Sequence, residues 1–290
     1  MTRCGPGKWS REKKAAIRRV AAFFSVQKGS FCDTMYLVKV CPLLLEKQGP
    51  SRQEWLTYNK RGTLPRRKEV KMITFDQIRH NETINTYIRK ADASLVQLGY
   101  TEHSFAHVSI VARNARYVLE TLGYDARTQE LVQIAAYLHD IGNLVNRVDH
   151  SQSGAVMAFR ILDKLGMDAA EIAEIVTAIG NHDEGTGRPV SAMAAALILA
   201  DKCDVRRSRV RNQDESKFDI HDRVNYSVQR AELTISEDKK SLLLKLSVDP
   251  HYGTVMDYFE IFMGRMQMCR NAAEKLGLQF RLEINDQELM

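Results

Sequence analysis

The strongest constraint in this sequence is a series of helical segments that each begin at a capping residue. Side chains that accept hydrogen bonds from free helix amides mark the starts: Asn81, Thr101, Asp125, Asp149, Asp168 and Ser191. Glycines follow most of the ends: Gly99, Gly123, Gly142, Gly166 and Gly180. The pattern predicts six successive helices, and the last, from Ser191 to about Asp204, is apolar on all sides. We therefore expect a mainly α-helical bundle.

The pattern changes towards the C-terminus, where strand-like runs appear. The predicted elements are a short helix from Phe218 to about Tyr226, strands Val228 to Ile235 and Leu242 to Val248, a helix from about Val255 to Leu276, and a strand from Leu278 to Ile284. We expect a helical domain over residues 72–226 and a small β-β-α-β appendage over residues 227–290.

The first 71 residues differ from the rest in charge and pattern. They hold 17 Lys and Arg against 5 Asp and Glu, whereas residues 72–290 hold 25 against 31, so the net charge of +6 comes from this leader. Its segment Lys8–Arg19 could form a basic helix that binds nucleic acid or a membrane surface. Residues 72–290 have no excess of positive charge. The isoelectric point near 9.0 therefore reflects the leader and does not by itself indicate that the rest of the chain binds nucleic acid.

A second reading of residues 1–71 is that they are not part of the natural protein. Helical patterning begins directly after Met72, and Lys68-Glu69-Val70 can be encoded by a purine-rich stretch that resembles a bacterial ribosome-binding site. We therefore hypothesise that translation begins at Met72 and that the leader is disordered or misannotated. No apolar run approaches the roughly 20 residues of a membrane helix. The five cysteines are scattered without a CxxC pair, which favours a cytoplasmic location.

A histidine and a carboxylate stand side by side where a buried helix should end. The apolar run from Leu131 to Leu138 is followed at once by His139-Asp140. An ionised carboxylate carried into the interior is costly unless it is paired or binds a metal. The doublet is either a metal-binding pair or a solvated polar pair in the last turn of the helix.

Further candidate ligands lie at or near the ends of the other predicted helices. Together with the doublet they form an ordered set: His107, His139, Asp140, His150, His182 and Asp201. Imidazole suits divalent transition metals, and a shared carboxylate suits two ions held close together. About six protein ligands are what a two-metal site requires.

The spacing of this set resembles the HD superfamily of metal-dependent phosphohydrolases. Five elements over residues 100–211 carry the resemblance in order: His107-Val108-Ser109-Ile110-Val111-Ala112, Leu138-His139-Asp140-Ile141-Gly142, His150-Ser151-Gln152-Ser153-Gly154-Ala155, Ala178-Ile179-Gly180-Asn181-His182 and Leu199-Ala200-Asp201-Lys202. The third and fourth elements are typical of the di-iron branch, which includes the symmetrical diadenosine-tetraphosphate hydrolases. The resemblance implies an HD-type helical bundle.

The resemblance also implies a role for each candidate ligand. His107, His139, Asp140 and Asp201 would hold one divalent ion, His150 and His182 would hold a second, and Asp140 would bridge the two. The ions would be iron or manganese, and a water activated between them would attack phosphorus. The implied substrate is a phosphate ester or anhydride of a small metabolite, with a nucleotide as the first candidate.

Two departures limit the substrate class. Asn143 stands where the related HD-GYP cyclic-dinucleotide phosphodiesterases have lysine, and Gly185-Thr186-Gly187-Arg188-Pro189 replaces their Gly-Tyr-Pro signature. Cyclic-dinucleotide hydrolysis is therefore not the favoured reading. The alternative to an enzyme is a non-catalytic regulatory protein that senses a metal or a nucleotide.

Basic residues beside the ligands are candidates for binding substrate phosphate. Lys202 and Arg206 lie closest to Asp201 in a run that continues to Arg211, and Arg147 and Arg188 lie on adjoining loops. The alternative for the run is salt bridges to the appendage or a homodimer surface. His103 precedes His107 by one helical turn and is either a ligand or part of the pocket wall. Asp183 and Glu184 either orient ligands or form a solvated turn.

Overall fold

The fold is built on helices that begin where the capping residues stand. The computed structural model describes residues 70–212 and 214–289, which belong to one compact unit, Lys68–Met290. The predicted leader, residues 1–71, lies outside the described residues except for Val70 and Lys71. None of the helices described is both long enough and apolar enough to cross a membrane.

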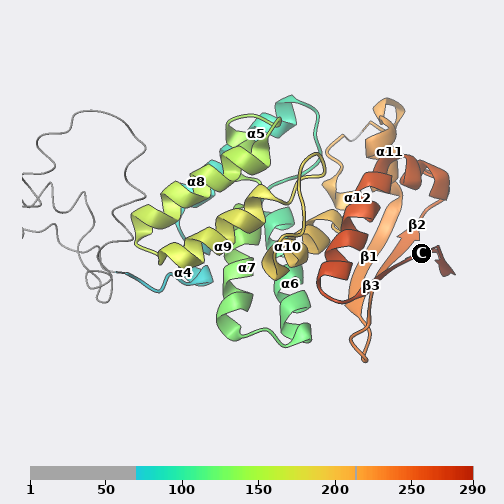
Figure 1. The fold of residues 1–290 in the computed structure, drawn as a ribbon. Coiled ribbons are helices and arrows are strands. Elements are labelled where there is room, and N and C mark those ends of the chain that lie inside the picture. Colours follow the sequence, from blue (N-terminus) through green and yellow to red (C-terminus); the bar gives the residue numbers. More distant parts are fainter. Residues whose placement is uncertain (1–69, 213, 290) are drawn as a thin grey trace, which may run out of the picture. The chain divides into compact units, whose positions relative to one another are not determined.

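Seven helices make up the first part of this unit (Figure 1). They are α4 (Phe75–Arg79), α5 (Glu82–Gln97), α6 (Phe105–Leu122), α7 (Ala126–Leu138), α8 (His150–Leu165), α9 (Ala169–Gly180) and α10 (Ala192–Lys202). Asn81, Asp125, Asp168 and Ser191 accept hydrogen bonds from the first amides of their helices, as the sequence predicted. Helix α10 is the central element, because every residue from Met193 to Lys202 is buried. It packs against α6, α7, α9 and α12.

Two predicted boundaries were wrong, and Asp149, although α8 begins directly after it, makes no capping hydrogen bond with its side chain. Thr101 does not cap α6, which begins at Phe105; the carboxylate of Glu102 instead accepts hydrogen bonds from the amides of Ser104 (2.7 Å) and His107 (3.4 Å). Helix α7 ends at Leu138 rather than Gly142, and the short 3-10 helix η2 (Ile141–Leu144) follows it. The chain therefore turns at the His139-Asp140 doublet itself.

The C-terminal part contains the predicted β-β-α-β unit. Short 3-10 helices η3 (Arg207–Arg209) and η4 (Glu215–Lys217) lead to α11 (Ile220–Ser227), β1 (Val228–Ile235), β2 (Ser241–Val248), α12 (Val255–Lys275), β3 (Gln279–Ile284) and β4 (Gln287–Glu288). The sheet order is β1-β2-β3-β4, with β2 and β3 parallel and the other pairs antiparallel. The mainly helical fold with a small C-terminal sheet is therefore confirmed, and β4 is an addition to the prediction.

Helix α12 joins the appendage to the helical part. It packs on α10 as well as on strands β2 and β3. Between α10 and α12 the buried thiols of Cys203 and Cys269 lie 3.9 Å apart. Helix α11 runs directly into β1 without a linker. The predicted domain boundary between residues 226 and 227 stays a prediction, and the core is continuous across it.

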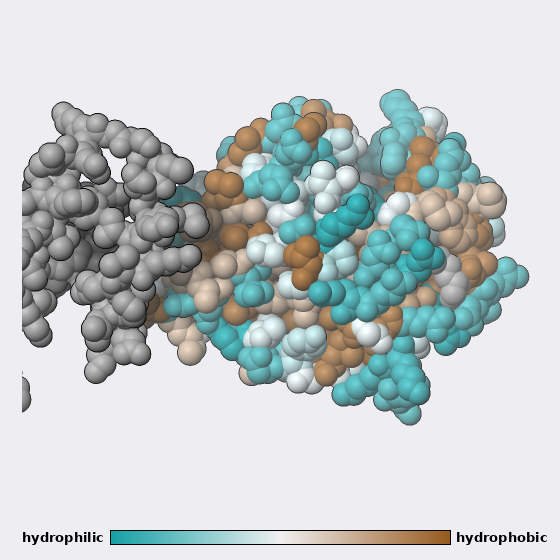
Figure 2. Space-filling model, in the orientation of Figure 1, coloured by the Kyte–Doolittle hydropathy of each residue, from teal (hydrophilic) through white to brown (hydrophobic). Residues whose placement is uncertain are grey.

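The inner face of helix α8 carries small residues in its middle and Leu162 further along, while two bulky apolar side chains lie outside. Gly154 and Ala158 are buried, whereas Val156 and Phe159 are 68% and 52% exposed. Hydrophobic patches are visible over α8 and α9 in Figure 2, while hydrophilic side chains predominate over α12. The small inner face lets α8 approach η2 closely, because a Cβ on Gly142 would lie 1.9 Å from the carbonyl oxygen of His150.

Gly142→Ala should therefore be strongly destabilising. The added methyl group would meet backbone atoms of α8, which cannot move without shifting the helix, so we expect the free energy of unfolding to fall by about 1–3 kcal/mol or more. Gly264→Ala on α12 is the matched control, since nothing lies within 4 Å of its added Cβ, and it should be neutral or stabilise by up to about 1 kcal/mol. Urea unfolding of both variants measures the difference. Equal stabilities would contradict the close packing at Gly142.

Candidate metal centre

Six buried side chains meet where the ends of the helices converge. His107 lies in the first turn of α6, His139 and Asp140 directly after α7, His150 at the start of α8, His182 two residues after α9, and Asp201 in the last turn of α10. All six are at most 9% exposed. The structure therefore brings together every ligand that the sequence predicted, from five different helices.

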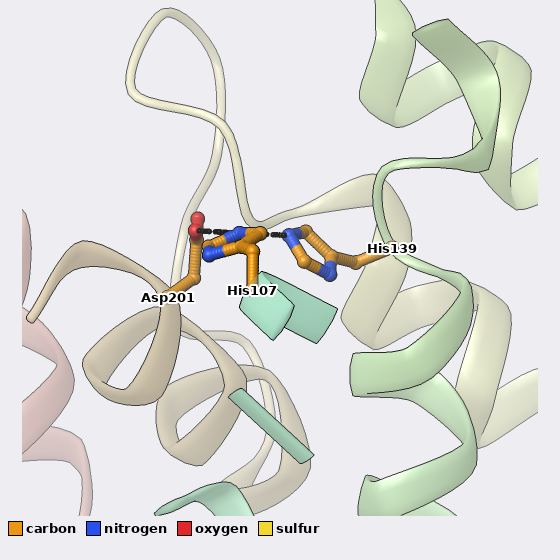
Figure 3. Close-up of side chains that lie close together, drawn as sticks. All are labelled: His107, His139 and Asp201. Carbon is orange, nitrogen blue, oxygen red and sulfur yellow. Dashed lines mark hydrogen bonds and ion pairs between the residues drawn. The ribbon is translucent and has the colours of Figure 1, made fainter. Parts of the chain in front are cut away.

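Five of the six side chains form two groups that share His139, and His150 belongs to neither group. In one group, ligand atoms of His107, His139 and Asp201 all lie within 4.8 Å of one another; in the other, those of His139, Asp140 and His182 do. Figure 3 shows the imidazole of His107 between Asp201 and His139, with Nε2 of His107 3.3 Å from Oδ1 of Asp201 and 3.3 Å from Nε2 of His139.

The two oxygens of Asp140 face different histidines. Oδ2 lies 3.2 Å from Nε2 of His139, and Oδ1 lies 3.5 Å from Nε2 of His150. Nε2 of His150 is in turn 3.1 Å from Nε2 of His182. Asp140 thus stands between a pair formed by His107 and His139 and a pair formed by His150 and His182.

Backbone carbonyl groups determine which ring nitrogen of three histidines carries a proton. Nδ1 of His139 lies 2.7 Å from the carbonyl oxygen of Ala136, and Nδ1 of His182 lies 2.6 Å from that of Ile179. His150 makes the same contact with Arg147 at 3.1 Å. Because a carbonyl oxygen can only accept, Nδ1 must donate in each case, which leaves the Nε2 lone pair of a neutral ring pointing into the cluster.

At His150 and His182, two electron-pair donors therefore face each other without a proton between them. Two neutral imidazoles with Nε2 atoms 3.1 Å apart, as in His150 and His182, repel rather than bond. Oδ2 of Asp140 is buried and accepts no hydrogen bond from any described residue. Such an oxygen is rare in a folded protein and costly without a cation. Imidazole nitrogens and carboxylate oxygens together are a donor set that fits divalent transition metals.

The charges in the cluster favour metal binding. Burial alone would raise the pKa of Asp140, but the charge of His139 holds it well below its usual range, and the ammonium of Lys202 does the same for Asp201. Burial and neighbouring cations lower the pKa values of His150 and His182. His139 is the exception: burial opposes its protonation, but the carboxylates of Asp140 and Asp201 raise its pKa to about 10. In the absence of a metal, a proton on His139 offsets the two carboxylates.

Asp204 belongs to the site, although it was not among the predicted residues. Its Oδ2 lies 2.7 Å from Nδ1 of His107, so the carboxylate holds a proton on Nδ1 and leaves Nε2 free for a metal. Asp204 is 5% exposed, and Arg206 and Arg209 surround it. The only signal in the sequence was its position three residues after Asp201, which does not distinguish it from an ordinary helix end.

Of the predicted phosphate-binding residues, Lys202 and Arg147 lie at the cluster. The ammonium of Lys202 is 2.7 Å from Oδ2 of Asp201 and 3.4 Å from Glu184. The guanidinium of Arg147 stacks on Tyr100 and contacts Nε2 of His150 at 3.3 Å. Both cations are therefore within reach of a ligand bound at the centre.

The other basic residues that were predicted to bind phosphate either have partners away from the cluster or are exposed. All three guanidinium nitrogens of Arg206 have partners, namely Asp204, Glu102 and Ser208. Arg207 pairs with Asp249 of the appendage at 3.4 Å, as the salt-bridge alternative predicted. Arg188 is exposed, and no contact joins its side chain to the cluster within the part that the structure describes.

The remaining candidates, His103, Asp183 and Glu184, lie around the six clustered side chains. The ring of His103 packs against that of His107 and lines a narrow recess together with Asp140, so it lies in the wall. Asp183 faces His150 at 3.8 Å, and Glu184 binds Lys202 and Arg265 rather than solvent alone.

The match to a family model agrees with this geometry. Residues 104–206, which span His107 to Asp204, match the family model of the HD domain. This part of the chain is similar to the HD domain. An uncharacterized protein of Methanocaldococcus jannaschii is 29% identical over 192 residues, covering 58% of this chain and 73% of the relative. Among solved structures, a predicted HD superfamily hydrolase from an uncultured Thermotogales bacterium is 29% identical, with a TM-score of 0.35, covering 44% of this chain and 69% of that one.

The HD-domain match supports a metal-dependent phosphohydrolase in general terms. HD domains bind divalent metals, and the buried histidine and aspartate groups of this chain have the composition to do so. The His139-Asp140 pair at the centre of the cluster has the two residue types of the doublet that gives the HD domain its name. The reading of this pair as a solvated helix end is excluded, because both residues are at most 5% exposed.

Asp204→Asn should weaken metal binding. Loss of the charge that orients His107 is expected to lower metal affinity about 10- to 100-fold. Asp238→Asn, in the exposed turn between β1 and β2, is the matched control and should bind metal as the unchanged protein does. Competition with a chromophoric chelator measures both affinities. Equal affinities of the two variants would show that Asp204 does not act on the metal through His107.

Metal binding should release a proton and strengthen as the pH rises. The raised pKa of His139, about 10, means that its ring is protonated near neutral pH, and a metal must displace that proton. We expect release of about one proton per chain at neutral pH. Calorimetric titration in buffers with different heats of protonation measures the number. Binding without proton release would contradict a protonated His139.

Proposed function

We propose that this protein is a two-metal phosphohydrolase that hydrolyses a phosphate ester or anhydride of a small metabolite, most simply a nucleotide. Iron or manganese would be the metal, in keeping with the di-iron branch of HD proteins that the motifs resemble, and the reaction would take place in the cytoplasm. The observation that carries the proposal is the position of Asp140. Its two oxygens face two separate histidine pairs, as a carboxylate shared by two ions must.

Each metal would have its own ligands in addition to the shared one. His107, His139 and Asp201 would hold the first ion, and His150 and His182 the second. Bound ions of this kind lower the pKa of water towards neutrality and offset charge on phosphoryl oxygens. Six protein ligands for two ions leave coordination positions for water and substrate.

The neighbouring side chains orient the ligands and counter the charge of the substrate. Asn143 donates to Oδ1 and to the backbone oxygen of Asp140, both at 2.9 Å, and so fixes the carboxylate. Lys202 is 5% exposed and holds the outer oxygen of Asp201. Arg147 has one nitrogen on His150, from which it would move to a substrate phosphate, because guanidinium binds phosphate more strongly than neutral imidazole.

His103 remains a prediction for substrate contact. Its Nδ1 donates to the carbonyl oxygen of Thr101 at 2.6 Å, and burial lowers its pKa well below the usual range. The ring is therefore neutral, and its Nε2 can accept a hydrogen bond from substrate or water. Arg206 and Arg188 remain predictions for phosphate binding, and the occupied nitrogens of Arg206 give it the weaker support.

Asp140→Asn should abolish both metal binding and hydrolysis. Loss of the shared charge removes the ligand common to both ions, so we expect less than about one metal per chain and a fall in rate of at least about 1,000-fold. His221→Gln on the surface of α11 is the matched control and should change neither quantity. Elemental analysis and a panel of nucleotides, dinucleoside polyphosphates and cyclic dinucleotides provide the measurements.

The panel also separates an enzyme from a regulatory protein. A full-length protein that binds about two metals per chain but turns over no member of the panel would favour the non-catalytic alternative. Hydrolysis that survives Asp140→Asn would end the proposal outright. Turnover of cyclic dinucleotides alone would replace the proposed substrate class.

A further inference from the structure

A chain of charges leads from the metal ligands to helix α12 of the appendage. Oδ2 of Asp201 contacts the ammonium of Lys202 at 2.7 Å, Lys202 contacts Oε1 of Glu184 at 3.4 Å, and the same oxygen lies 2.8 Å from Nε of Arg265. Glu184 stands two residues after the ligand His182. Arg265, which follows Asp201 by 64 positions in the sequence, is thus linked to it through three successive contacts.

Arg265 differs from the arginines of the predicted phosphate-binding run. Each arginine of that run has at least one terminal guanidinium nitrogen on a partner: Glu102 and Ser208 for Arg206, Asp249 for Arg207, the carbonyl oxygen of Asp204 for Arg209, and Asp92 for Arg211. Arg265 uses only Nε, and no bond to its two terminal nitrogens is found within the described residues. Its side chain is 29% exposed, so this end of the guanidinium is open to a ligand.

The packing around Arg265 holds it in this orientation. Its guanidinium lies over the ring of Phe262, 4.7 Å from the ring centroid, and Glu184 fixes Nε. The loop that carries Glu184 is itself pressed against α12, because a Cβ on Gly187 would lie 2.7 Å from Cε of Met268. A guanidinium held through Nε presents its two terminal N–H groups as a fork, the geometry that binds phosphate oxygens bidentately.

We propose that Arg265 binds a second phosphoryl group of the substrate, beside the one held at the metal centre. Lys202 and Glu184 separate Arg265 from the ligand Asp201, so Arg265 does not contact the phosphoryl group bound at the metal centre. It reaches the next phosphoryl group along a diphosphate or polyphosphate chain. The substrate class is therefore phosphoric anhydrides or compounds with adjacent phosphates rather than simple monoesters. This inference rests on the proposed function, because it assumes a phosphoryl group at the metals.

The test compares pyrophosphate with inorganic phosphate on the metal-loaded full-length protein. Arg265→Met keeps an apolar stem over Phe262 and removes the charge, so pyrophosphate affinity should fall about tenfold, whereas phosphate affinity should change less than about twofold. Arg265→Lys retains the charge without the fork and should recover part of the loss. Arg270→Met on the same helix, where Arg270 faces Glu274 on the surface at 4.0 Å, is the matched control and should bind both ligands normally.

Metal content and thermal unfolding of each variant show whether the site and the fold are intact. Because Arg265→Lys preserves the ion pair with Glu184, it keeps the comparison interpretable even if Arg265→Met unfolds. Equal pyrophosphate affinity in Arg265→Lys and the unchanged protein, or equal losses for phosphate and pyrophosphate, would overturn this inference alone. A metal-loaded protein that binds neither ligand would overturn the proposed function as well.

Discussion

The site depends on one electrostatic constraint: electron-pair donors that repel one another are held together around the buried carboxylate of Asp140. Nε2 of His150 and Nε2 of His182 lie 3.1 Å apart, and Oδ2 of Asp140 makes no hydrogen bond to a described residue, although the ring of His139 lies 3.2 Å from it. An arrangement of this kind costs stability in the absence of a cation. The surrounding fold must therefore supply the free energy that keeps the donors in place.

The ends of the helices supply it through backbone contacts. The carbonyl groups of Ala136 and Ile179 hold Nδ1 of His139 and His182 from one turn earlier in the chain. The close approach of η2 to α8, which requires the absence of a side chain at Gly142, fixes His150 against Asp140. Because these contacts are made by the main chain, they orient the ligands whether or not a metal is bound, and metal binding then relieves the repulsion.

Much of this arrangement could be predicted from the sequence, for identifiable physical reasons. Capping residues and glycines are local signals, so helix ends such as Asn81 and Gly166 were predicted correctly. The ligands stand at such ends, and their spacing is fixed by the helices between them. Thr101 failed as a cap because Glu102, held by Arg206 and Arg209 from far along the chain, takes over the free amides of α6. Asp204 and Arg265 were missed for the same reason, since only tertiary packing gives them their partners.

The basic residues that follow Asp201 in the sequence are directed to different partners by the fold. Arg206 follows Asp201 closely, but the chain leaves α10 there and turns the guanidinium towards Asp204, where it fixes a carboxylate that orients His107. The open guanidinium belongs to α12 instead. The six candidate metal ligands thus all come from the part of the chain that is similar to the HD domain, whereas the outermost cation comes from the appendage. Changes in α12 could then alter which phosphorylated compound is accepted without disturbing any metal ligand, and the two parts of the chain would have to stay packed together for the substrate to be bound.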